Sequence, residues 1–348
     1  MLLSEQSDDF MKKATEVARR YFLQEPRLPH FPANFDTFPI LRSLDELLSL
    51  RHTQRNLLLP DLSSFNSLAI FSDYSGEQKG SEYRTYSFLV TGDGATGHYS
   101  EVIREIRDAN GIPPLKEIAY KDLGYGPVNR SLTAILDAAD QIPGLLFTLA
   151  VHRDVASLFK KSPRDVSQLL SAQGSLALPP AVAEKSLRIV LFLVYLGSLL
   201  GRDGQRIFWF SDQDDIISDK ARTNNLLRIF DGAPSAISQT KFSGGGLASQ
   251  APKSKRSTSD LKIDVDALLS IPDLFAGVLI PVLSQWRNDE PKTVKSGAGK
   301  IIEMLCHQGV FLKKLVYLIE PHPEGMSGSI LDFKDNSEAA GNRTVILI

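Results

Sequence analysis

Short apolar runs alternate with segments of helical hydrophobic spacing along most of the chain. Residues 68–71 and 83–90 are apolar runs separated by a turn-forming cluster, which predicts a β-hairpin. From Tyr99, apolar side chains recur at i, i+3, i+4 and i+7, the spacing of an amphipathic helix that we expect to end at Asn110-Gly111. Similar patterns predict strands at 145–151, 206–210 and 344–348, and helices at 44–51, 181–200, 216–230, 265–286 and 301–319. Because the helix at 181–200 is apolar on nearly all sides, we expect a layered α/β core.

These elements group into three parts. We expect an N-terminal helical extension at 1–66, a core domain at 67–290 and a C-terminal helical and strand elaboration at 291–348. Within the core, residues 243–260 combine Gly and Ser with Lys253, Lys255 and Arg256, which is typical of a flexible basic loop. Such a loop could contact phosphates, although a solvated linker has the same composition.

Composition narrows the classes of protein to which the chain could belong. The 348 residues are 43% hydrophobic, and 39 Lys and Arg against 41 Asp and Glu give a net charge of −2, so any nucleic-acid binding must come from a local patch. The single cysteine, Cys306, excludes an internal disulfide and a cysteine-based zinc site. The N-terminus does not resemble a secretory signal, and the strongest apolar run, 189–196, is far below the ~20 residues of a membrane span. We expect a cytoplasmic protein with no membrane segment.

Acidic residues follow two of the predicted strands. Asp73 closes the run at 68–71, and Asp212, Asp214 and Asp215 close the run at 207–210. Open α/β sheets place functional groups at strand ends, and converging carboxylates repel one another unless a cation neutralises them. Their hard oxygen atoms favour Mg²⁺ or Mn²⁺. The alternative is that each acid caps the turn or helix that follows it.

Four short motifs occur in a fixed order between residues 68 and 283. They are residues 68–76 (LAIFSDYSG) with the strand that follows, 116–121 (KEIAYK), 207–215 (IFWFSDQDD) and 271–277 (IPDLFAG). Together they resemble the RNase-H-like family catalogued as domain of unknown function 3800. That family has a first strand ending in Asp-Glu-Ser-Gly, a Glu-hydrophobic-Lys motif, a central strand with a terminal Asp, and a late Ala-Asp-Leu-hydrophobic-Ala-Gly helix. The resemblance implies an α/β fold with an RNase-H-like mixed sheet flanked by helices.

The resemblance also implies an acidic site. The implied catalytic and metal-binding residues are Asp73, Glu117, Asp212 and Asp273, with Asp215 as a further metal ligand. The chain departs from the family at Tyr74, where Glu is usual, at Ala119, where Lys is usual, and at Pro272, where Ala is common. Glu77 could replace the missing carboxylate only if its turn folds back.

The function expected from this resemblance is a metal-dependent nuclease. Carboxylates would hold two Mg²⁺ or Mn²⁺ ions, one activating the attacking water and the other stabilising the leaving oxygen. The partner would be DNA or RNA, while a protein partner or a second copy of the chain stays an open question. A different class of function is a catalytically weakened nucleic-acid-binding or scaffold protein, to which Tyr74 and Ala119 point. A small-molecule phosphohydrolase is the third alternative.

Overall fold

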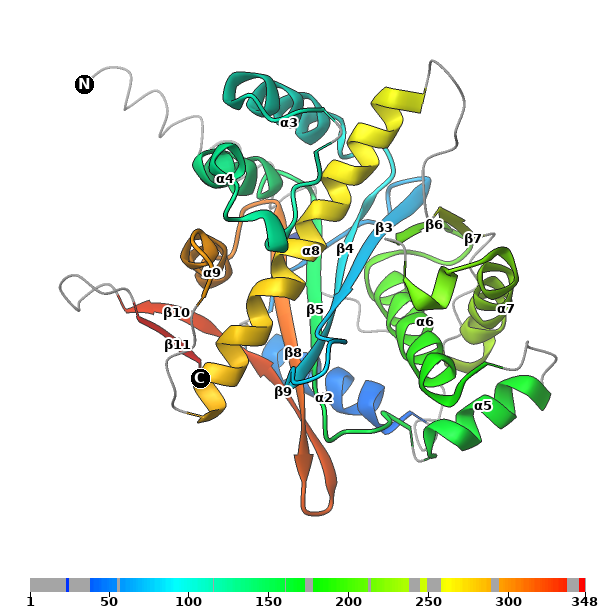
Figure 1. Cartoon of the computed structure of the whole chain (residues 1–348). Helices are drawn as coiled ribbons and strands as arrows, with labels where there is room; N and C mark the ends of the chain where they lie inside the picture. The colour runs from blue at the N-terminus through cyan, green and yellow to red at the C-terminus, as the bar shows by residue number, and fades with distance from the viewer. Residues whose placement is uncertain are drawn as a thin grey trace.

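A mixed β-sheet of seven strands forms the centre of the protein, with helices on both faces (Figure 1). The computed structural model describes residues 23–24, 38–54, 57–114, 116–159, 161–172, 178–211, 214–237, 245–248, 258–288, 294–336 and 344–347. The sheet strands are β3 (Ser67–Ser75), β4 (Tyr83–Gly92), β5 (Gly144–His152), β6 (Arg206–Ser211), β7 (Gly245–Ala248), β8 (Leu312–His322) and β9 (Gly325–Leu331). The predicted α/β class with a mixed sheet is therefore confirmed.

Strand order places β3 near the middle of the sheet. The order is β7-β6-β3-β4-β5-β8-β9. β3 pairs antiparallel with β4, which pairs antiparallel with β5, whereas β6 and β7 run parallel to β3. β8 is parallel to β5 and antiparallel to β9. The carboxyl ends of β3, β5, β6 and β8 consequently lie at the same edge of the sheet.

Two helical layers cover the sheet. One face packs on α2 (Pro39–Thr53), α5 (Pro163–Ala172), α6 (Pro180–Leu200) and α7 (Lys220–Ile237). The other packs on α3 (Gly97–Asn110), α4 (Gly126–Ala139), α8 (Thr258–Asn288) and α9 (Ala298–Cys306). The remaining elements are the 3₁₀ turns η2 (Tyr120–Asp122) and η3 (Asp215–Ile217) and two small ladders, β1 (Leu23–Gln24) with β2 (Leu59–Pro60) and β10 (Phe333–Asn336) with β11 (Thr344–Leu347).

Alternation along β3 decides which layer each of its side chains meets. Leu68 and Ile70 belong to the core on the α6 side, whereas Ala69 and Phe71 belong to the core on the α8 side. Because successive side chains of a strand point to opposite faces, Asp73 follows Phe71 toward α8. Burial on both faces explains why this strand is a continuous apolar run in the sequence.

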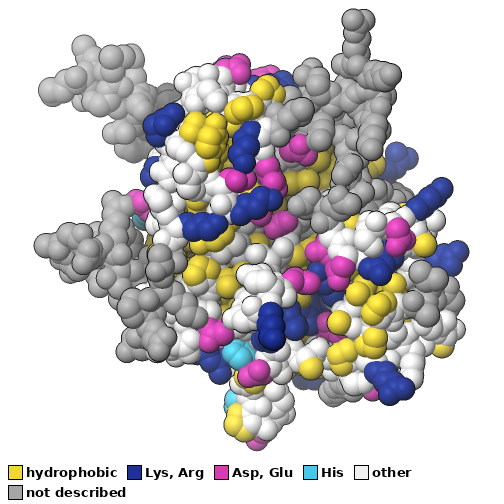
Figure 2. All heavy atoms as spheres, viewed as in Figure 1, with side chains coloured by type: hydrophobic (Ala, Val, Ile, Leu, Met, Phe, Trp, Pro, Cys, Tyr) yellow, Lys and Arg dark blue, Asp and Glu magenta, His cyan; other side chains and the backbone are white. Residues whose placement is uncertain are grey.

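The helix α8 lies across β3 and β4. Its stretch Asp264–Asn288 is long and apolar enough to span a membrane by length and composition alone, but 72% of its most apolar window is buried inside the protein. In the face drawn in Figure 2, basic and acidic side chains are interspersed. We conclude that α8 is a core helix of the α/β fold.

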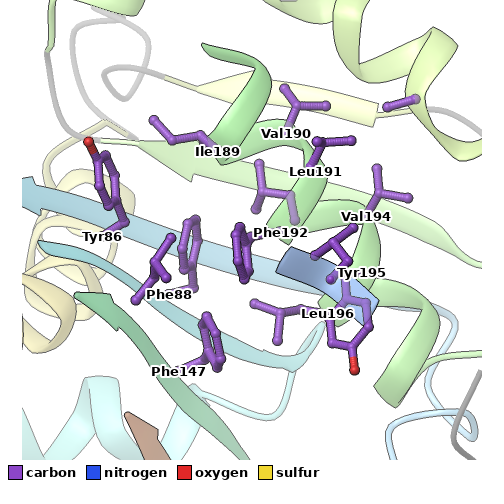
Figure 3. Packing of buried hydrophobic residues seen from close by; sticks show 14 of the residues in the cluster. Tyr86, Phe88, Phe147, Ile189, Val190, Leu191, Phe192, Val194, Tyr195 and Leu196 are labelled. Carbon is purple, nitrogen blue, oxygen red and sulfur yellow. The ribbon is translucent and has the colours of Figure 1, made fainter. Parts of the chain in front are cut away.

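On the opposite face, α6 packs its apolar side chains against the sheet. Tyr86 and Phe88 of β4 and Phe147 of β5 point toward Phe192 and its neighbours on α6 (Figure 3). The rings of Phe147 and Phe192 stack with centroids 5.7 Å apart, an arrangement that adds about 0.5–1.5 kcal/mol beyond the buried area. This contact fixes α6 on the face of β4 and β5 opposite to α8.

Two sequence predictions are wrong. We expected one helix at 301–319, but the helix α9 ends at Cys306 and residues from Leu312 onward form the strand β8. β8 is buried between β5 and β9, and a fully buried strand has the same continuous apolar pattern as a buried helix.

The second wrong prediction is the loop at 243–260. This range contains β7, which pairs with β6, and α8 begins inside it at Thr258. Its Gly-rich sequence carries no strand signal.

The predicted domain boundaries can be placed on this fold. The boundary at 290 falls between α8 and α9, and the strands β8 and β9 that follow it join the central sheet. Of the predicted extension at 1–66, the structure describes β1, α2 and β2 within residues 23–24, 38–54 and 57–66. Leu41, Leu44 and Leu48 of α2 are fully buried in the core on the α6 side.

Candidate functional site

Asp73 lies near the carboxyl end of β3 and is 8% exposed. In the adjacent strand it is paired with Ser87, whose hydroxyl shares a 2.9 Å hydrogen bond with the hydroxyl of Thr148 on β5. Ser87 and Thr148 are buried. A row of polar side chains therefore crosses three strands on the α8 side of the sheet.

One hydrogen bond ties α8 to this end of the sheet. Thr85, two residues before Ser87 on β4, donates a 2.8 Å hydrogen bond to the carbonyl of Ala276. Asp273 lies about one helical turn before Ala276 and accepts a hydrogen bond from the backbone amide of Tyr120. Asp73 and Asp273 are thus on the same side of the sheet, contributed by a central strand and by the helix that crosses it.

The 3₁₀ turn η2 packs directly against α8 at Gly277. A Cβ atom at position 277 would overlap the ring of Tyr120, so only glycine allows this approach. Lys295 donates hydrogen bonds to the carbonyls of Tyr120 and Lys121, at 3.3 and 2.9 Å, and its ammonium lies 5.2 Å from the centroid of the Tyr120 ring. These contacts hold η2 over the carboxylate of Asp273.

Glu117 lies at the surface just before η2. Its carboxylate is 2.8 Å from the ammonium of Lys121, four residues later, with the two side chains 50% and 68% exposed. The hydrogen bond with Glu117 raises the pKa of Lys121, and the charges of Glu117, Asp273 and Asp122 act in the same direction. Lys121 is therefore paired with Glu117 and lies within electrostatic range of Asp273.

Lysines and acids are interleaved around η2. Besides the pair of Glu117 with Lys121, Lys116 lies 2.9 Å from the carboxylate of Asp122 and 5.7 Å from the centroid of the Tyr125 ring. Figure 2 shows this mixture of basic and acidic side chains over η2 and the middle of α8. A surface with both signs can bind a phosphate through its lysines and a cation through its carboxylates.

The described acids that follow β6 in the sequence do not lie with Asp73 and Asp273. Asp212 lies outside the described residues. Asp215, the predicted further ligand, begins η3, and its carboxylate is 3.0 Å from the ammonium of Lys185 on α6. Asp215 is therefore engaged with the α6 layer, not with the α8 layer that faces Asp73.

Lys185 is the centre of a second charged cluster, which we call the Lys185 cluster: Lys185, Glu77, Asp214 and Asp215. The ammonium of Lys185 is 2.7 Å from Glu77 and 2.8 Å from Asp214, and its side chain is 6% exposed. It also lies 5.4 Å from the centroid of the Tyr74 ring. Burial disfavours the charge of Lys185, but the carboxylates of Asp214 and Glu77 outweigh this effect and raise its pKa.

The two aspartates of this cluster differ in their acidity. Burial raises the pKa of Asp214 to about 6, and its hydrogen bond with Asp215 acts in the same direction. Burial acts to raise the pKa of Asp215 too, but the hydrogen bond from Asp214 and the charges and hydrogen bonds of its basic neighbours, Lys185 first, together outweigh it and lower the pKa. Of these two carboxylates, Asp214 is therefore the one that takes up a proton first as the pH falls.

The described residues do not bring all the predicted acids together. Asp73 and Asp273 share one side of the sheet, Glu117 is beside Asp273 through Lys121, and Asp215 and Glu77 belong to the Lys185 cluster. Among the residues that the structure describes, no three His, Cys, Asp or Glu side chains are arranged to hold a metal ion. Glu77 thus does not fold back toward Asp73 to replace the carboxylate that the family carries at position 74.

Two lysines that the sequence analysis did not select are central to this arrangement. The pairing of Lys121 could have been predicted from the sequence, because Lys121 follows Glu117 at the i, i+4 spacing. The same holds for Lys185, because Glu184, Lys185 and Arg188 are charged residues inside an apolar helix and must find partners when buried. Of the predicted basic loop, the side chains of Lys253, Lys255 and Arg256 lie outside the described residues.

Comparison of the chain with protein-family models, with curated proteins and with solved structures gave no significant match.

Proposed function

We propose that the protein is a divalent-metal-dependent phosphodiesterase that cleaves nucleic acid on an RNase-H-like scaffold. One observation carries the proposal. Asp73 is a buried carboxylate at the carboxyl end of a central strand, on the side of the sheet where α8 contributes Asp273. A buried carboxylate that shares a surface with a second acid is a frequent feature of catalytic sites.

The order of the strands supports the RNase-H-like part of the proposal. Three strands consecutive along the chain, β3, β4 and β5, are antiparallel, and β6 and β7 continue the sheet on the other side of β3, parallel to it. This is the arrangement expected of an RNase-H-like sheet, with β8 and β9 added beyond β5. Ligands of open α/β sheets bind outside the carboxyl ends of such strands, which is where Asp73 lies.

The residues that would hold Mg²⁺ or Mn²⁺ are Asp73 and Asp273, with Glu117 once it exchanges Lys121 for the ion. Their oxygen atoms suit hard divalent ions. Asp73, Asp273 and Glu117 are described residues, and Asp212 is the further ligand that the resemblance implies. The bound ion would lower the pKa of the attacking water and stabilise the leaving oxygen.

The lysines around η2 would contribute to binding the substrate. Lys121 is charged at neutral pH, with a pKa that Glu117 raises further, and Lys116 and Lys295 lie on the same surface. Positive side chains beside the carboxylates would attract the phosphates of a DNA or RNA strand and orient the scissile bond. The basic segment with Lys253, Lys255 and Arg256 would extend this attraction.

The test is a cleavage assay with the full chain on single-stranded and double-stranded DNA and RNA, with Mg²⁺, with Mn²⁺ and with EDTA. We expect metal-dependent cleavage that Asp73→Asn abolishes, since this change removes a charge and almost no volume. The matched control is Asp137→Asn, at an acid of α4 that is not in the site. Unchanged turnover in Asp73→Asn, or no cleavage by the wild-type chain under any condition, would contradict the proposal.

A second candidate is a nucleic-acid-binding protein without hydrolysis. It is favoured by the present partners of the acids, because Asp273 accepts the amide of Tyr120 and Glu117 is paired with Lys121. In this case the acids serve as caps and ion-pair partners. Binding of nucleic acid with no metal-dependent cleavage, in both wild type and Asp73→Asn, would support this second function.

A further inference from the structure

Lys185 connects segments that follow two neighbouring parallel strands. Glu77 is in the turn after β3, and Asp214 precedes η3 after β6. Ser72 of β3 and Ser211 of β6 are paired in the parallel ladder, so both segments leave the sheet at the same edge. The ammonium of Lys185 lies within 3.0 Å of carboxylates from both segments.

The contact is made from a rigid element. Lys185 is in the second turn of α6, a helix whose residues 189–196 are buried, most of them in the apolar core that covers the sheet. Both oxygens of Asp214 accept from Lys185, at 2.8 and 2.9 Å, and Asp214 also accepts from the amide of Ile216 at 3.3 Å. The backbone of η3 is held further by Arg222, which donates a 2.6 Å hydrogen bond to the carbonyl of Asp215. The ammonium therefore fixes two loops to one helix.

A buried ammonium is costly unless several anions surround it, and here three carboxylates do so. Three carboxylates without the ammonium would repel one another, and because they come from two segments, the segments would separate. Lys185 thus acts as a tether between the ends of β3 and β6. The neighbouring cation of α6, Arg188, differs in this respect, because it pairs with Glu184 of its own helix and with Tyr86 inside the sheet.

We infer that Lys185 is a positioning residue that holds the segments after β3 and β6 together and thereby fixes the strand end that carries Asp73. Asp73 lies on the other side of the sheet, so Lys185 acts through the backbone and does not contact the proposed site. For its effect on metal binding the inference rests on the proposed function. For the tether itself it rests on the geometry of the Lys185 cluster alone.

Hydrogen–deuterium exchange tests the tether without any assumption about activity. Two reporter amides are Ser81, which donates to the carbonyl of Gln78, and Ile217, which donates to the carbonyl of Asp214. In Lys185→Met we expect exchange in residues 76–82 and 214–219 to become at least about tenfold faster, because local opening costs less free energy. Lys185→Arg should restore slow exchange. The segments of β5 should be unchanged.

The matched control is Lys314→Met. Lys314 is a buried lysine paired with Asp140 at 2.7 Å, with a side chain 2% exposed, near the opposite end of the sheet. The substitution Lys314→Met should destabilise the protein without accelerating hydrogen exchange in the two reporter segments. If Lys185→Met leaves both segments unchanged, or if Lys314→Met accelerates them equally, the inference is wrong.

Two further measurements complete the test. Glu77→Gln removes one anion at a half-exposed position and should accelerate hydrogen exchange only in residues 76–82. This variant provides the test if Lys185→Met does not fold. Unchanged exchange in Glu77→Gln would overturn the inference. A titration of the melting temperature with Mn²⁺ should show weaker metal binding in Glu77→Gln, which loosens the segment after β3 without leaving an uncompensated acidic cluster, than in Lys314→Met. If the exchange results agree with the tether but wild type shows no response to Mn²⁺, the tether is supported and the proposed function fails.

Discussion

Asp73 and Tyr74 are consecutive residues of β3, and their side chains lie on opposite faces of the sheet. Asp73 faces the α8 layer, whereas the hydroxyl of Tyr74 is hydrogen-bonded with Ser72 on the α6 side. In the resembling family, position 74 carries Glu. A side chain at this position of β3 points away from Asp73, so Tyr74 does not remove a ligand from the α8 side.

The first prediction separates the roles of these two neighbours. Tyr74→Phe removes the 2.8 Å hydrogen bond with Ser72 and the weaker 3.4 Å contact with Ser211. We expect a loss of about 1 kcal/mol in the free energy of unfolding, the usual net value of one hydrogen bond. Ser72 keeps a partner, because Trp209 donates to it at 2.8 Å. Urea unfolding of both proteins measures the loss.

Tyr74→Phe should leave the response to Mn²⁺ unchanged, because its side chain faces α6. Asp73→Asn should reduce that response, although it hardly changes the volume. The comparison uses the shift of the melting temperature at increasing Mn²⁺ concentration. If Tyr74→Phe reduces the response as strongly as Asp73→Asn, the two faces of the sheet are not functionally separate.

The contact of α8 with η2 leads to a second prediction. In an exposed helix interior, Gly→Ala stabilises by about 0.5–1 kcal/mol. At Gly277 the added methyl group would overlap the ring of Tyr120, so Gly277→Ala should instead destabilise by about 1–3 kcal/mol. The control is Gly232→Ala in α7, where an added Cβ meets no other atom within 4 Å and the usual gain should appear. Equal stabilisation by both changes would mean that η2 does not pack on Gly277.

The spacing of apolar residues along the chain correctly predicted several helices and strands. The run at 68–71 became β3, and the apolar residues at helical spacing after Tyr99 became α3, with Gly111 at a positive φ of 64° after its end. The pattern failed at β8, since a strand buried on both faces carries no alternation that would separate it from a helix. It also left α4 unassigned, although Val128, Leu132 and Ile135 have helical spacing.

The candidate site was predictable only in part. An acid after an apolar run is visible in the sequence, so Asp73 was selected, and the resemblance added Asp273. No sequence pattern predicts on which face of the sheet a loop packs. Glu77 and Asp215 lie in loops that pack on the α6 face, so neither is near Asp73. Their partner Lys185 comes from a helix more than 100 residues away from Glu77 along the chain, a contact that the tertiary fold alone creates.

A third prediction concerns pH. His152 ends β5, is buried, packs edge-on against the Tyr83 ring and lies 3.6 Å from the carboxylate of Asp154. Burial lowers its pKa below the ordinary 6.5, the charge of Arg287 acts in the same direction, and the acids Asp154, Glu320 and Glu82 oppose both. The neutral form is therefore favoured in the folded state.

Because its folded pKa is depressed, His152 contributes stability that is present above pH 6.5 and is lost as the pH falls through its folded pKa. We expect the free energy of unfolding to decrease between about pH 7 and pH 5. His152→Gln, which does not titrate, should reduce this decrease. Urea unfolding at several pH values measures both slopes, and identical slopes would show that other groups cause the pH dependence.

The last prediction concerns Lys121, the cation that is paired with Glu117. The ammonium of Lys121 is 2.8 Å from Glu117, and Asp273 also acts on its pKa, so it competes with any divalent ion for these carboxylates. Lys121→Met removes this competitor, and one charge at a largely exposed position corresponds to roughly 1 kcal/mol or less. We therefore expect Mn²⁺ to bind about three to five times more tightly to Lys121→Met than to wild type, whereas Lys161→Met, at an exposed lysine outside the site, should bind it as wild type does. Calorimetric titration with Mn²⁺ measures the three affinities. An affinity of Lys121→Met equal to that of wild type, or lower, would mean that Lys121 does not compete with a metal ion for these carboxylates.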